Sequence, residues 1–258
     1  MEAMRLRVTR SIIPNLFTIG NLFSGFLAII YFAHGLTQPH SLLIGAQYIL
    51  AAALFDMLDG IMARLTHSSS ELGVELDSLC DVVSFGVAPS VMLYVAHYHD
   101  QGPAGLLLAG FPAIAGAYRL ARFNVQLTSF DDKLYFRGLP IPAGALTLVS
   151  YVVFYLWGGI VPPEWRHIAT NFVTVIVSLA MISTIRYDNV PRPTRRSLSQ
   201  RPVFSTAFIV SILAVIVSGG TLAFPIMALY IVVGAAAHSI RLYRKRREER
   251  LDFDDFDD

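Results

Sequence analysis

Residues 56–81 read DMLDGIMARLTHSSSELGVELDSLCD and contain four aspartates at short, regular intervals. A short polar turn, THSSSELG, joins two apolar segments, so these segments can return side by side. On helices, Asp56 shares a face with Asp59 three residues later, and Asp77 shares one with Asp81 four residues later. Both pairs are therefore predicted to converge on one point near the ends of two helices.

The composition predicts a membrane protein. Of the 258 residues, 54% are hydrophobic and only 15% are charged, whereas an ordinary soluble domain carries about 25% charged residues. A membrane-spanning helix needs about 20 mostly apolar residues, and eight such segments can be drawn, near residues 16–33, 42–65, 75–97, 104–124, 143–161, 169–185, 203–219 and 223–243. Continuous apolar runs do not fit an outer-membrane barrel. We expect one all-α integral membrane domain over residues 1–243, with about eight transmembrane helices.

The distribution of positive charge predicts how these helices are oriented. With the N-terminus in the cytoplasm and the segments alternating, 19 of the 20 Lys and Arg residues fall on the cytoplasmic side, and only Arg166 falls outside. Positive residues accumulate on that side of membrane proteins, so both termini are predicted to be cytoplasmic. Residues 244–258 form a charged tail that we expect to be disordered. Its basic part suits anionic lipid head groups, and no nucleic-acid partner is predicted.

Four converging carboxylates would repel one another strongly, and divalent cations would relieve that repulsion. Mg²⁺ and Mn²⁺ are hard ions that take oxygen ligands and commonly bridge carboxylates to phosphate groups. Two such ions close together can clamp a phosphate ester during a displacement reaction. The sequence therefore predicts a metal site made by Asp56, Asp59, Asp77 and Asp81.

Two other interpretations of the four aspartates stay open. They could be helix caps or solvated side chains at the membrane edge, although they occur together with Gly60, Ala63 and Arg64 at regular spacing. They could instead line the path of a cation transporter. A transporter predicts carboxylates spread through the depth of the membrane, whereas all four here fall near one face.

The aspartates and the residues between them resemble the complete signature of the CDP-alcohol phosphotransferases, which reads here Asp56-x2-Asp59-Gly60-x2-Ala63-Arg64-x8-Gly73-x3-Asp77-x3-Asp81. Every fixed position agrees with that signature. The resemblance implies that Asp56, Asp59 and Asp77 hold two divalent cations, Mg²⁺ or Mn²⁺. It also implies that Asp81 ligates one of these cations and is the general base for the acceptor alcohol.

The same resemblance implies roles for the residues between the aspartates. Gly60, Ala63 and Gly73 would mark where the nucleotide packs closely against helix backbone. Arg64 would pair with the pyrophosphate, a task that suits a planar, permanently charged guanidinium. Ser70, in the turn, is a further candidate for a nucleotide contact.

Two polar residues of the first apolar segment, Thr18 and Asn21, are candidates for the same donor site. They lie one turn apart if the segment is helical. They could hydrogen-bond the cytidine or the pyrophosphate of a CDP-linked lipid. Hydrogen bonding between helices is an equally good interpretation of both residues.

Four further stretches resemble the phosphatidylserine synthase branch of this family: PNLFTIGNLFSG (14–25), DVVSFGVAPS (81–90), YRLARFNV (118–125) and FRGLPIPAG (136–144). The resemblance implies transfer of the phosphatidyl group of CDP-diacylglycerol to the hydroxyl of L-serine, which gives phosphatidylserine and CMP. Another acceptor alcohol stays possible, most plausibly glycerol 3-phosphate, and otherwise inositol or choline. The family also implies a homodimer in the cytoplasmic (inner) membrane of a prokaryote, with its active site facing the cytoplasm.

The resemblance to the phosphatidylserine synthase branch also indicates candidate residues for a site that binds the acceptor, L-serine. Arg119, Arg122 and Asn124 lie within one and a half turns near the end of the fourth segment. L-serine carries a carboxylate, and arginine is well suited to hold a carboxylate in a fixed orientation. Ordinary positive-inside anchoring is the alternative for these arginines. Arg137 is a further candidate for the acceptor pocket or for lipid head groups.

Overall fold

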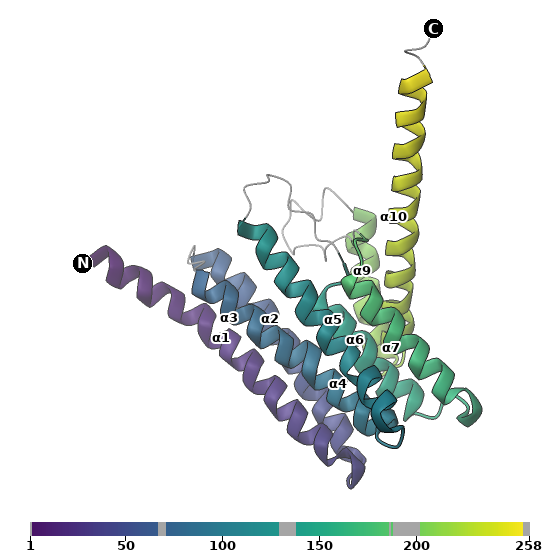
Figure 1. Ribbon diagram of the computed structural model, residues 1–258. Helices are drawn as coiled ribbons and strands as arrows, with labels where there is room; N and C mark the ends of the chain where they lie inside the picture. Colours follow the sequence, from purple (N-terminus) through teal and green to yellow (C-terminus); the bar gives the residue numbers. More distant parts are fainter. Residues whose placement is uncertain (1, 67–70, 129–137, 186, 188–201, 255–258) are drawn as a thin grey trace.

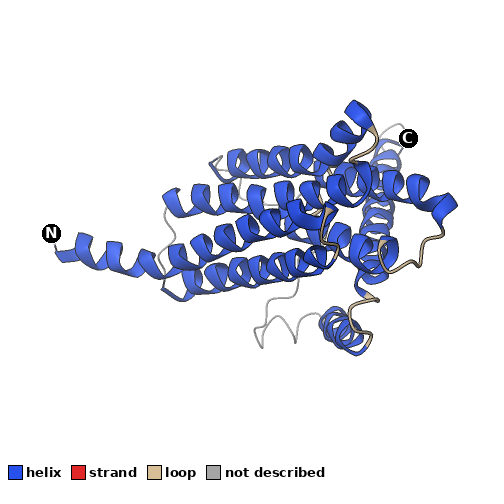
Figure 2. Cartoon of the chain, turned by 90° about the horizontal axis from the view of Figure 1, so that it is seen from below, coloured by secondary structure: helices blue, strands red, loops and turns tan. Residues whose placement is uncertain are grey.

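The computed structural model describes residues 2–66, 71–128, 138–185, 187 and 202–254, and every regular element in these ranges is helical (Figure 2). The α-helices are α1 (Glu2–Ala33), α2 (His40–Thr66), α3 (Glu71–Asp81), α4 (Ala88–Leu93), α5 (Gly102–Thr128), α6 (Ile141–Ser150), α7 (Arg166–Ile182), α9 (Pro202–Val217) and α10 (Ala223–Asp254). Short helical segments of other geometry connect them: η1 (His34–Leu36), η2 (Val82–Val87), η3 (Tyr94–Tyr98), η4 (Tyr151–Leu156) and η5 (Pro163–Trp165).

The first half of the chain forms a set of long neighbouring helices. Helices α1 and α2 make an antiparallel hairpin, and α3, η2, α4 and η3 continue one another as a single rod (Figure 1). This rod packs between α1 and α5. The start of α1 and the end of α10 lie toward the same side of the molecule (Figure 1). Carboxylates of α2 and of α3 approach one another, as the polar turn between the two helices predicts.

The rod that contains Asp81 departs from regular α-helix in two places. Segments η2 and η3 are π-helical, and η2 begins at the residue that follows Asp81. π-Helical turns inside α-helices are frequent at functional sites because they re-aim the side chains beside them. Here η2 brings Ser84 against Gly25 of α1, where an added Cβ would collide with the Ser84 side chain and Cα. The two helices are in very close contact just past the aspartates.

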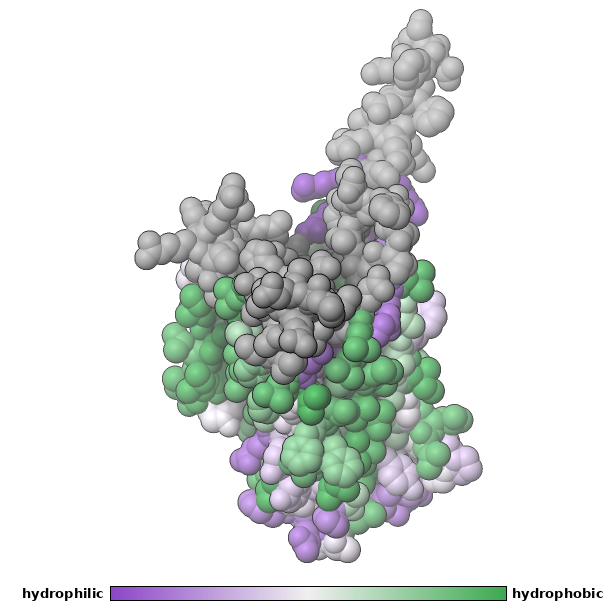
Figure 3. Space-filling view, turned by 90° about the vertical axis from the view of Figure 1, so that its left-hand side faces the viewer, coloured by the Kyte–Doolittle hydropathy of each residue, from purple (hydrophilic) through white to green (hydrophobic). Residues whose placement is uncertain are grey.

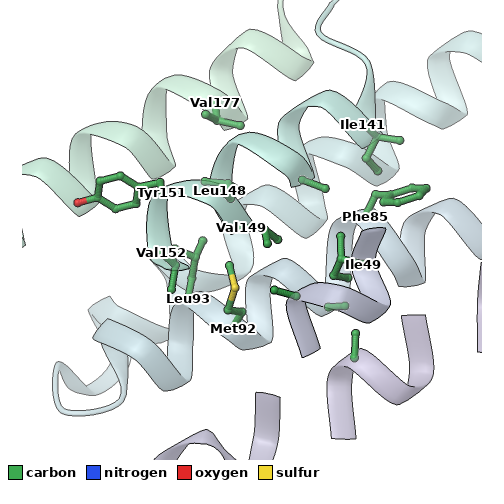
Figure 4. Close-up of a cluster of buried hydrophobic side chains, with 14 of the residues drawn as sticks. Ile49, Phe85, Met92, Leu93, Ile141, Leu148, Val149, Tyr151, Val152 and Val177 are labelled. Atoms are coloured by element: carbon green, nitrogen blue, oxygen red, sulfur yellow. The ribbon is translucent and has the colours of Figure 1, made fainter. Parts of the chain in front are cut away.

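The apolar core lies between the rod and the second half of the chain. Figure 4 shows side chains from α2, the rod, α6, η4 and α7 pointing toward one another. The labelled residues are Ile49, Phe85, Met92, Leu93, Ile141, Leu148, Val149, Tyr151, Val152 and Val177. Close-packed protein interiors transmit small displacements. The core therefore holds α6 and α7 at fixed distances from the helices that carry the aspartates.

The predicted apolar segments all fall on helices. Within the described residues, six helices are long and apolar enough to cross a bilayer, namely 14–36, 40–65, 72–98, 102–126, 163–182 and 223–244, and two shorter apolar helices cover 141–156 and 206–217. Apolar side chains cover much of the face drawn in Figure 3, with polar residues gathered at its lower end. The all-helical membrane fold is confirmed, while the count of eight spans and the cytoplasmic termini stay predictions.

Helix α10 is longer than the span predicted for it. It continues past residue 243 to Asp254, through most of the segment that we expected to be a disordered tail. The stretch 244–250 is rich in Lys, Arg and Glu, all of which are good helix formers. The domain boundary at residue 243 stays a prediction.

Candidate active site

Three of the four aspartates form a tight group at the meeting point of α2 and α3. Asp56 and Asp59 come from the last turns of α2, and Asp77 comes from α3. Each offers a carboxylate oxygen, and these oxygens all lie within 4.8 Å of one another. Asp59 is buried and the other two are half-buried. The convergence predicted for the four aspartates is therefore present for these three residues.

The group has the donor set of a site for a hard divalent cation. Asp59 Oδ2 and Asp77 Oδ1 are buried, and neither has a hydrogen-bond partner in the described part of the protein. A buried carboxylate oxygen without a partner is costly. Mg²⁺ and Mn²⁺ both prefer oxygen ligands of this kind. The residues present therefore fit a metal ion.

Asp81 lies beside this group and has a partner of its own. Its carboxylate is only 6% exposed, and its Oδ1 accepts a hydrogen bond from Asn21 Nδ2 at 3.0 Å. The charges of Asp56 and Asp77 are close enough to act on it. Asp81 is not one of the three residues whose oxygens lie within 4.8 Å of one another. The structure therefore separates a group of three carboxylates from a fourth that is held by an amide.

Thr18 and Asn21 both lie on the buried face of α1, next to the carboxylates. The Thr18 hydroxyl donates to the carbonyl oxygen of Pro14 at 3.2 Å, and its side chain lies beside Asp59. Asn21 contacts Asp81 as described. The first helix therefore contributes polar groups to the site, and the predicted contact of these residues with a nucleotide stays a prediction.

Arg119 is the cation that the fold buries close to the carboxylates. It comes from α5, is 7% exposed, and lies near the charges of Asp81 and Asp56. Its Nε is buried and has no hydrogen-bond partner among the described residues. An arginine that is desolvated but not fully paired is ready to bind an anion. This arrangement suits the predicted role of Arg119 in the acceptor site.

Arg122 and Asn124, from the same helix, make contacts within the protein. Arg122 donates from Nη1 to the carbonyl of Ile182 at 2.7 Å and from Nη2 to the carbonyl of Ser183 at 2.9 Å, so it caps the end of α7. Asn124 Nδ2 donates to Ser78 Oγ at 3.0 Å. These contacts are structural, and an additional role of either residue in acceptor binding stays a prediction.

The small residues and the arginine of the signature lie along the ends of α2 and α3. The guanidinium of Arg64 is exposed and lies over Gly60, where an added Cβ would meet Arg64 Nη1 at 3.4 Å. Ala63 and Gly73 are half-buried at the same end. This leaves Arg64 accessible to a ligand, as its predicted role requires. Ser70 and Arg137 lie outside the described residues.

Two contacts at the site were not predicted from the sequence. Ser84 Oγ donates to the backbone carbonyl of Asn21 at 3.0 Å, and Tyr230 of α10 lies near Arg119. The SFG stretch at 84–86 and the small Gly25 could have suggested close packing of two helices. No pattern in a single sequence links residue 230 to residue 119, because they belong to helices far apart in the chain.

Comparisons with known proteins agree on one family. The sequence profile described as CDP-alcohol phosphatidyltransferase matches residues 11–184. The chain is 36% identical over 176 residues to the CDP-diacylglycerol–serine O-phosphatidyltransferase of Helicobacter pylori, which covers 68% of this chain and 71% of that protein. It is 33% identical over 217 residues to the enzyme of the same name from Methanocaldococcus jannaschii, covering 84% and 89%. An archaetidylserine synthase from Methanothermobacter thermautotrophicus is 37% identical over 180 residues, covering 69% and 70%.

Proposed function

Since the chain belongs to the CDP-alcohol phosphatidyltransferase family, we propose that it transfers the phosphatidyl group of CDP-diacylglycerol to the hydroxyl of L-serine. The products would be phosphatidylserine and CMP. The observation that carries this proposal is the convergence of Asp56, Asp59 and Asp77 beside a separate carboxylate, Asp81, and a buried arginine, Arg119. Serine as the acceptor is supported by the names of the relatives, two of which are serine phosphatidyltransferases and one an archaetidylserine synthase.

Asp56, Asp59 and Asp77 would hold the divalent cations, and we propose that Asp81, beside this group, also ligates one of them. We propose two ions, either Mg²⁺ or Mn²⁺. When bound, they neutralise the pyrophosphate of the donor and the charge that develops on the departing CMP. The exposed Arg64 guanidinium would hold the same pyrophosphate from the side of the nucleotide, because a planar guanidinium can bind phosphate with two parallel hydrogen bonds.

Asp81 acts as the general base in the proposed reaction. It accepts the proton of the serine hydroxyl while the serine oxygen forms a bond to the lipid-side phosphorus. The bond between that phosphorus and the bridging oxygen of CMP breaks, and CMP leaves with the electron pair. Direct displacement of this kind needs no nucleophile from the protein. A phosphatidyl group trapped covalently on the enzyme would therefore contradict it.

Arg119 is the residue that best fits the carboxylate of serine. It is buried near Asp81, so a carboxylate bound to it would bring the serine hydroxyl close to the base. The unpaired Nε provides a donor for that carboxylate. Arg122 is less suitable for this role, because its guanidinium is used at the end of α7.

We further propose that the site faces the cytoplasm at the edge of the inner membrane of a prokaryote. There the acyl chains of the donor stay in lipid while cytidine stays in water. The placement is supported by the 19 positive residues predicted on one side and by the bacterial relative. A homodimer is also proposed, on the family resemblance alone; the mass of the purified protein in detergent tests it.

The decisive experiment measures CMP release by the purified protein from CDP-diacylglycerol with Mg²⁺ or Mn²⁺. L-serine is compared with glycerol 3-phosphate, inositol and choline, and Asp81→Asn is tested in parallel. We expect release that depends on serine and that falls about 100- to 10,000-fold in the variant, which lacks the general base. Release with another alcohol would keep the metal site but replace the acceptor. If folded protein releases no CMP with any alcohol, the phosphotransferase proposal is wrong, and transport of cations by the four aspartates becomes the interpretation to test.

A further inference from the structure

We propose that Asn21 is a positioning residue for the general base. Its side-chain amide holds one oxygen of Asp81 and thereby directs the other oxygen toward the acceptor hydroxyl. The inference rests on the proposed function, because it assigns to Asn21 a role in the proton transfer by Asp81. It differs from the sequence prediction, in which Asn21 binds the donor nucleotide or simply joins two helices.

The contact itself is short and fully enclosed. Asn21 Nδ2 donates to Asp81 Oδ1 at 3.0 Å, and the side chains of the two residues are 0% and 6% exposed. An ionised carboxylate can only accept hydrogen bonds, so the amide must present its NH₂ group to it. The contact engages Oδ1 and not Oδ2. The contact therefore favours one orientation of the Asp81 carboxylate about its Cβ–Cγ bond over the others.

The packing of α1 against η2 fixes the position of this amide. Ser84 Oγ donates to the backbone carbonyl of Asn21 at 3.0 Å, three residues after Asp81. One turn further along α1, Gly25 lies directly against Ser84, with no room for a Cβ. The packing of Gly25 against Ser84 Cα and Cβ, which Ser84→Ala would keep, therefore holds the Asn21 backbone at a set distance from Asp81. A side chain on such a rigid support orients its partner better than one on a loop.

The other polar atom of the Asn21 amide, Oδ1, indicates that a ligand binds beside it. Asn21 Oδ1 is buried and has no hydrogen-bond partner among the described residues. In a side chain that only joins helices, both halves of the amide would normally be satisfied, since a buried unpaired acceptor is costly. The free acceptor suits a donor on the substrate, such as a hydroxyl or an ammonium group.

If Asn21 only joined α1 to η2, its loss would have a different effect on activity. Ser84→Ala is the matched control that separates the two roles. That variant removes one hydrogen bond between the same two helices, of equal length and burial, without touching Asp81. Asn21→Ala removes the bond to the carboxylate. If Asn21 only joins helices, the two variants will lose activity to the same small extent.

The experiment is a double-mutant cycle on CMP release, with thermal stability measured in detergent. We expect Asn21→Ala to lower kcat about 10- to 100-fold, the usual effect of losing an orienting partner, with KM for CDP-diacylglycerol changed less than about threefold. The solvent isotope effect on kcat should rise, because proton transfer to a misdirected base becomes slower. Ser84→Ala should keep most of the parental kcat and its isotope effect.

In the second arm of the cycle, Asn21→Ala is introduced into the protein that already carries Asp81→Asn. We expect Asn21→Ala to cause no further loss there, because residues that act as a unit are not additive. Equal further loss in both backgrounds, or an unchanged isotope effect, would overturn the inference while leaving the proposed function intact. If the parent protein uses another alcohol, the cycle is run with that alcohol. Absence of CMP release with any alcohol would overturn both.

Discussion

Arg119 and the carboxylates near it show how a single buried charge can indicate a ligand. Removing a charge from water is expensive unless it is paired and hydrogen-bonded. Arg119 Nε, Asp59 Oδ2 and Asp77 Oδ1 are all buried without a partner in the described residues. The two carboxylate oxygens belong to the acidic group, which can bind cations, and Arg119 lies near Asp81 and Asp56, where it can bind an anion. At the scale of the residue, the site is complete only when both are bound.

The acidic group provides the first prediction. Asp59→Asn keeps the size of the side chain but removes one charge from the three carboxylates that lie within 4.8 Å of one another. We expect CMP release to fall by at least about 100-fold, since metal stabilisation of the leaving group is a major contribution. The concentration of Mn²⁺ needed for half-maximal activity should rise, which a metal titration measures. Parental activity at the same metal concentration would contradict the assignment.

Arg119 provides the second prediction. Arg119→Lys keeps the positive charge but loses the planar fork that holds a carboxylate with two hydrogen bonds. We expect KM for L-serine to rise about tenfold, with KM for CDP-diacylglycerol nearly unchanged in the same protein. Steady-state kinetics with each substrate varied in turn provides the measurement. An effect confined to the lipid substrate would move Arg119 to the donor site.

At the scale of the element, contacts between helices position the site. The rod that carries Asp77 and Asp81 is held against α1 through Gly25 and Ser84, and the end of α7 is held by Arg122. In lipid, helices associate through close packing of small residues and through hydrogen bonds between helices. The glycine provides the first kind of contact and the arginine provides the second. Both can be tested without altering the carboxylates.

Gly25→Ala tests the close approach of α1 to η2. A Cβ at this position would collide with the Ser84 side chain and Cα, so the helices must separate. We expect a loss of about 1–3 kcal/mol in stability, as for other overpacked interiors, and a lower melting temperature in detergent. Gly110→Ala is the matched control, because an added Cβ there meets nothing within 4 Å. Equal melting temperatures for the two variants would show that α1 is not tightly held.

Arg122→Met tests the cap on α7. The variant keeps the apolar part of the side chain but leaves the carbonyls of Ile182 and Ser183 without these two donors. We expect a destabilisation of about 1–2 kcal/mol, measured as a lower melting temperature, with KM for L-serine unchanged. A large rise in that KM with no change in stability would instead support the acceptor role that the sequence predicted.

At the scale of the whole molecule, the arrangement in the membrane decides from which side the substrates arrive. The start of α1 and the end of α10 lie on one side of the molecule (Figure 1), the side expected to carry most of the positive charge. A donor lipid would reach the aspartates from the bilayer, and serine would reach them from the water on that side. The orientation can be measured because Cys80 is the only cysteine of the chain.

The orientation is tested by cysteine labelling in a Cys80→Ser background. His40→Cys places a thiol at the exposed start of α2, and Tyr243→Cys places one on α10, where the side chain is 72% exposed. We expect an impermeant maleimide to label the first variant in intact cells and the second only after the membrane is opened. The reverse result would invert the topology and place the active site outside the cytoplasm.

Much of the fold and of the candidate site could be predicted from the spacing of residues along the chain. Apolar segments and the positions of positive residues depend only on composition along the chain, so the all-helical membrane fold followed from them. The group made by Asp56, Asp59 and Asp77 followed from helical periodicity and a short turn. The separate environments of Arg119 and Arg122 could not be predicted in the same way. They are three residues apart on one helix and equally basic, but one faces carboxylates and the other faces the end of α7.

The class of fold, the family and the acidic group could therefore be predicted from the sequence, because these depend on residues within about one helical turn or on either side of one short turn. Which arginine is buried near the carboxylates, and which amide holds Asp81, depends on how the helices pack. The contact between Asn21 and Asp81 joins residues 60 positions apart. It depends on how far each helix is rotated about its own axis, and the packing of Gly25 against Ser84 fixes that rotation.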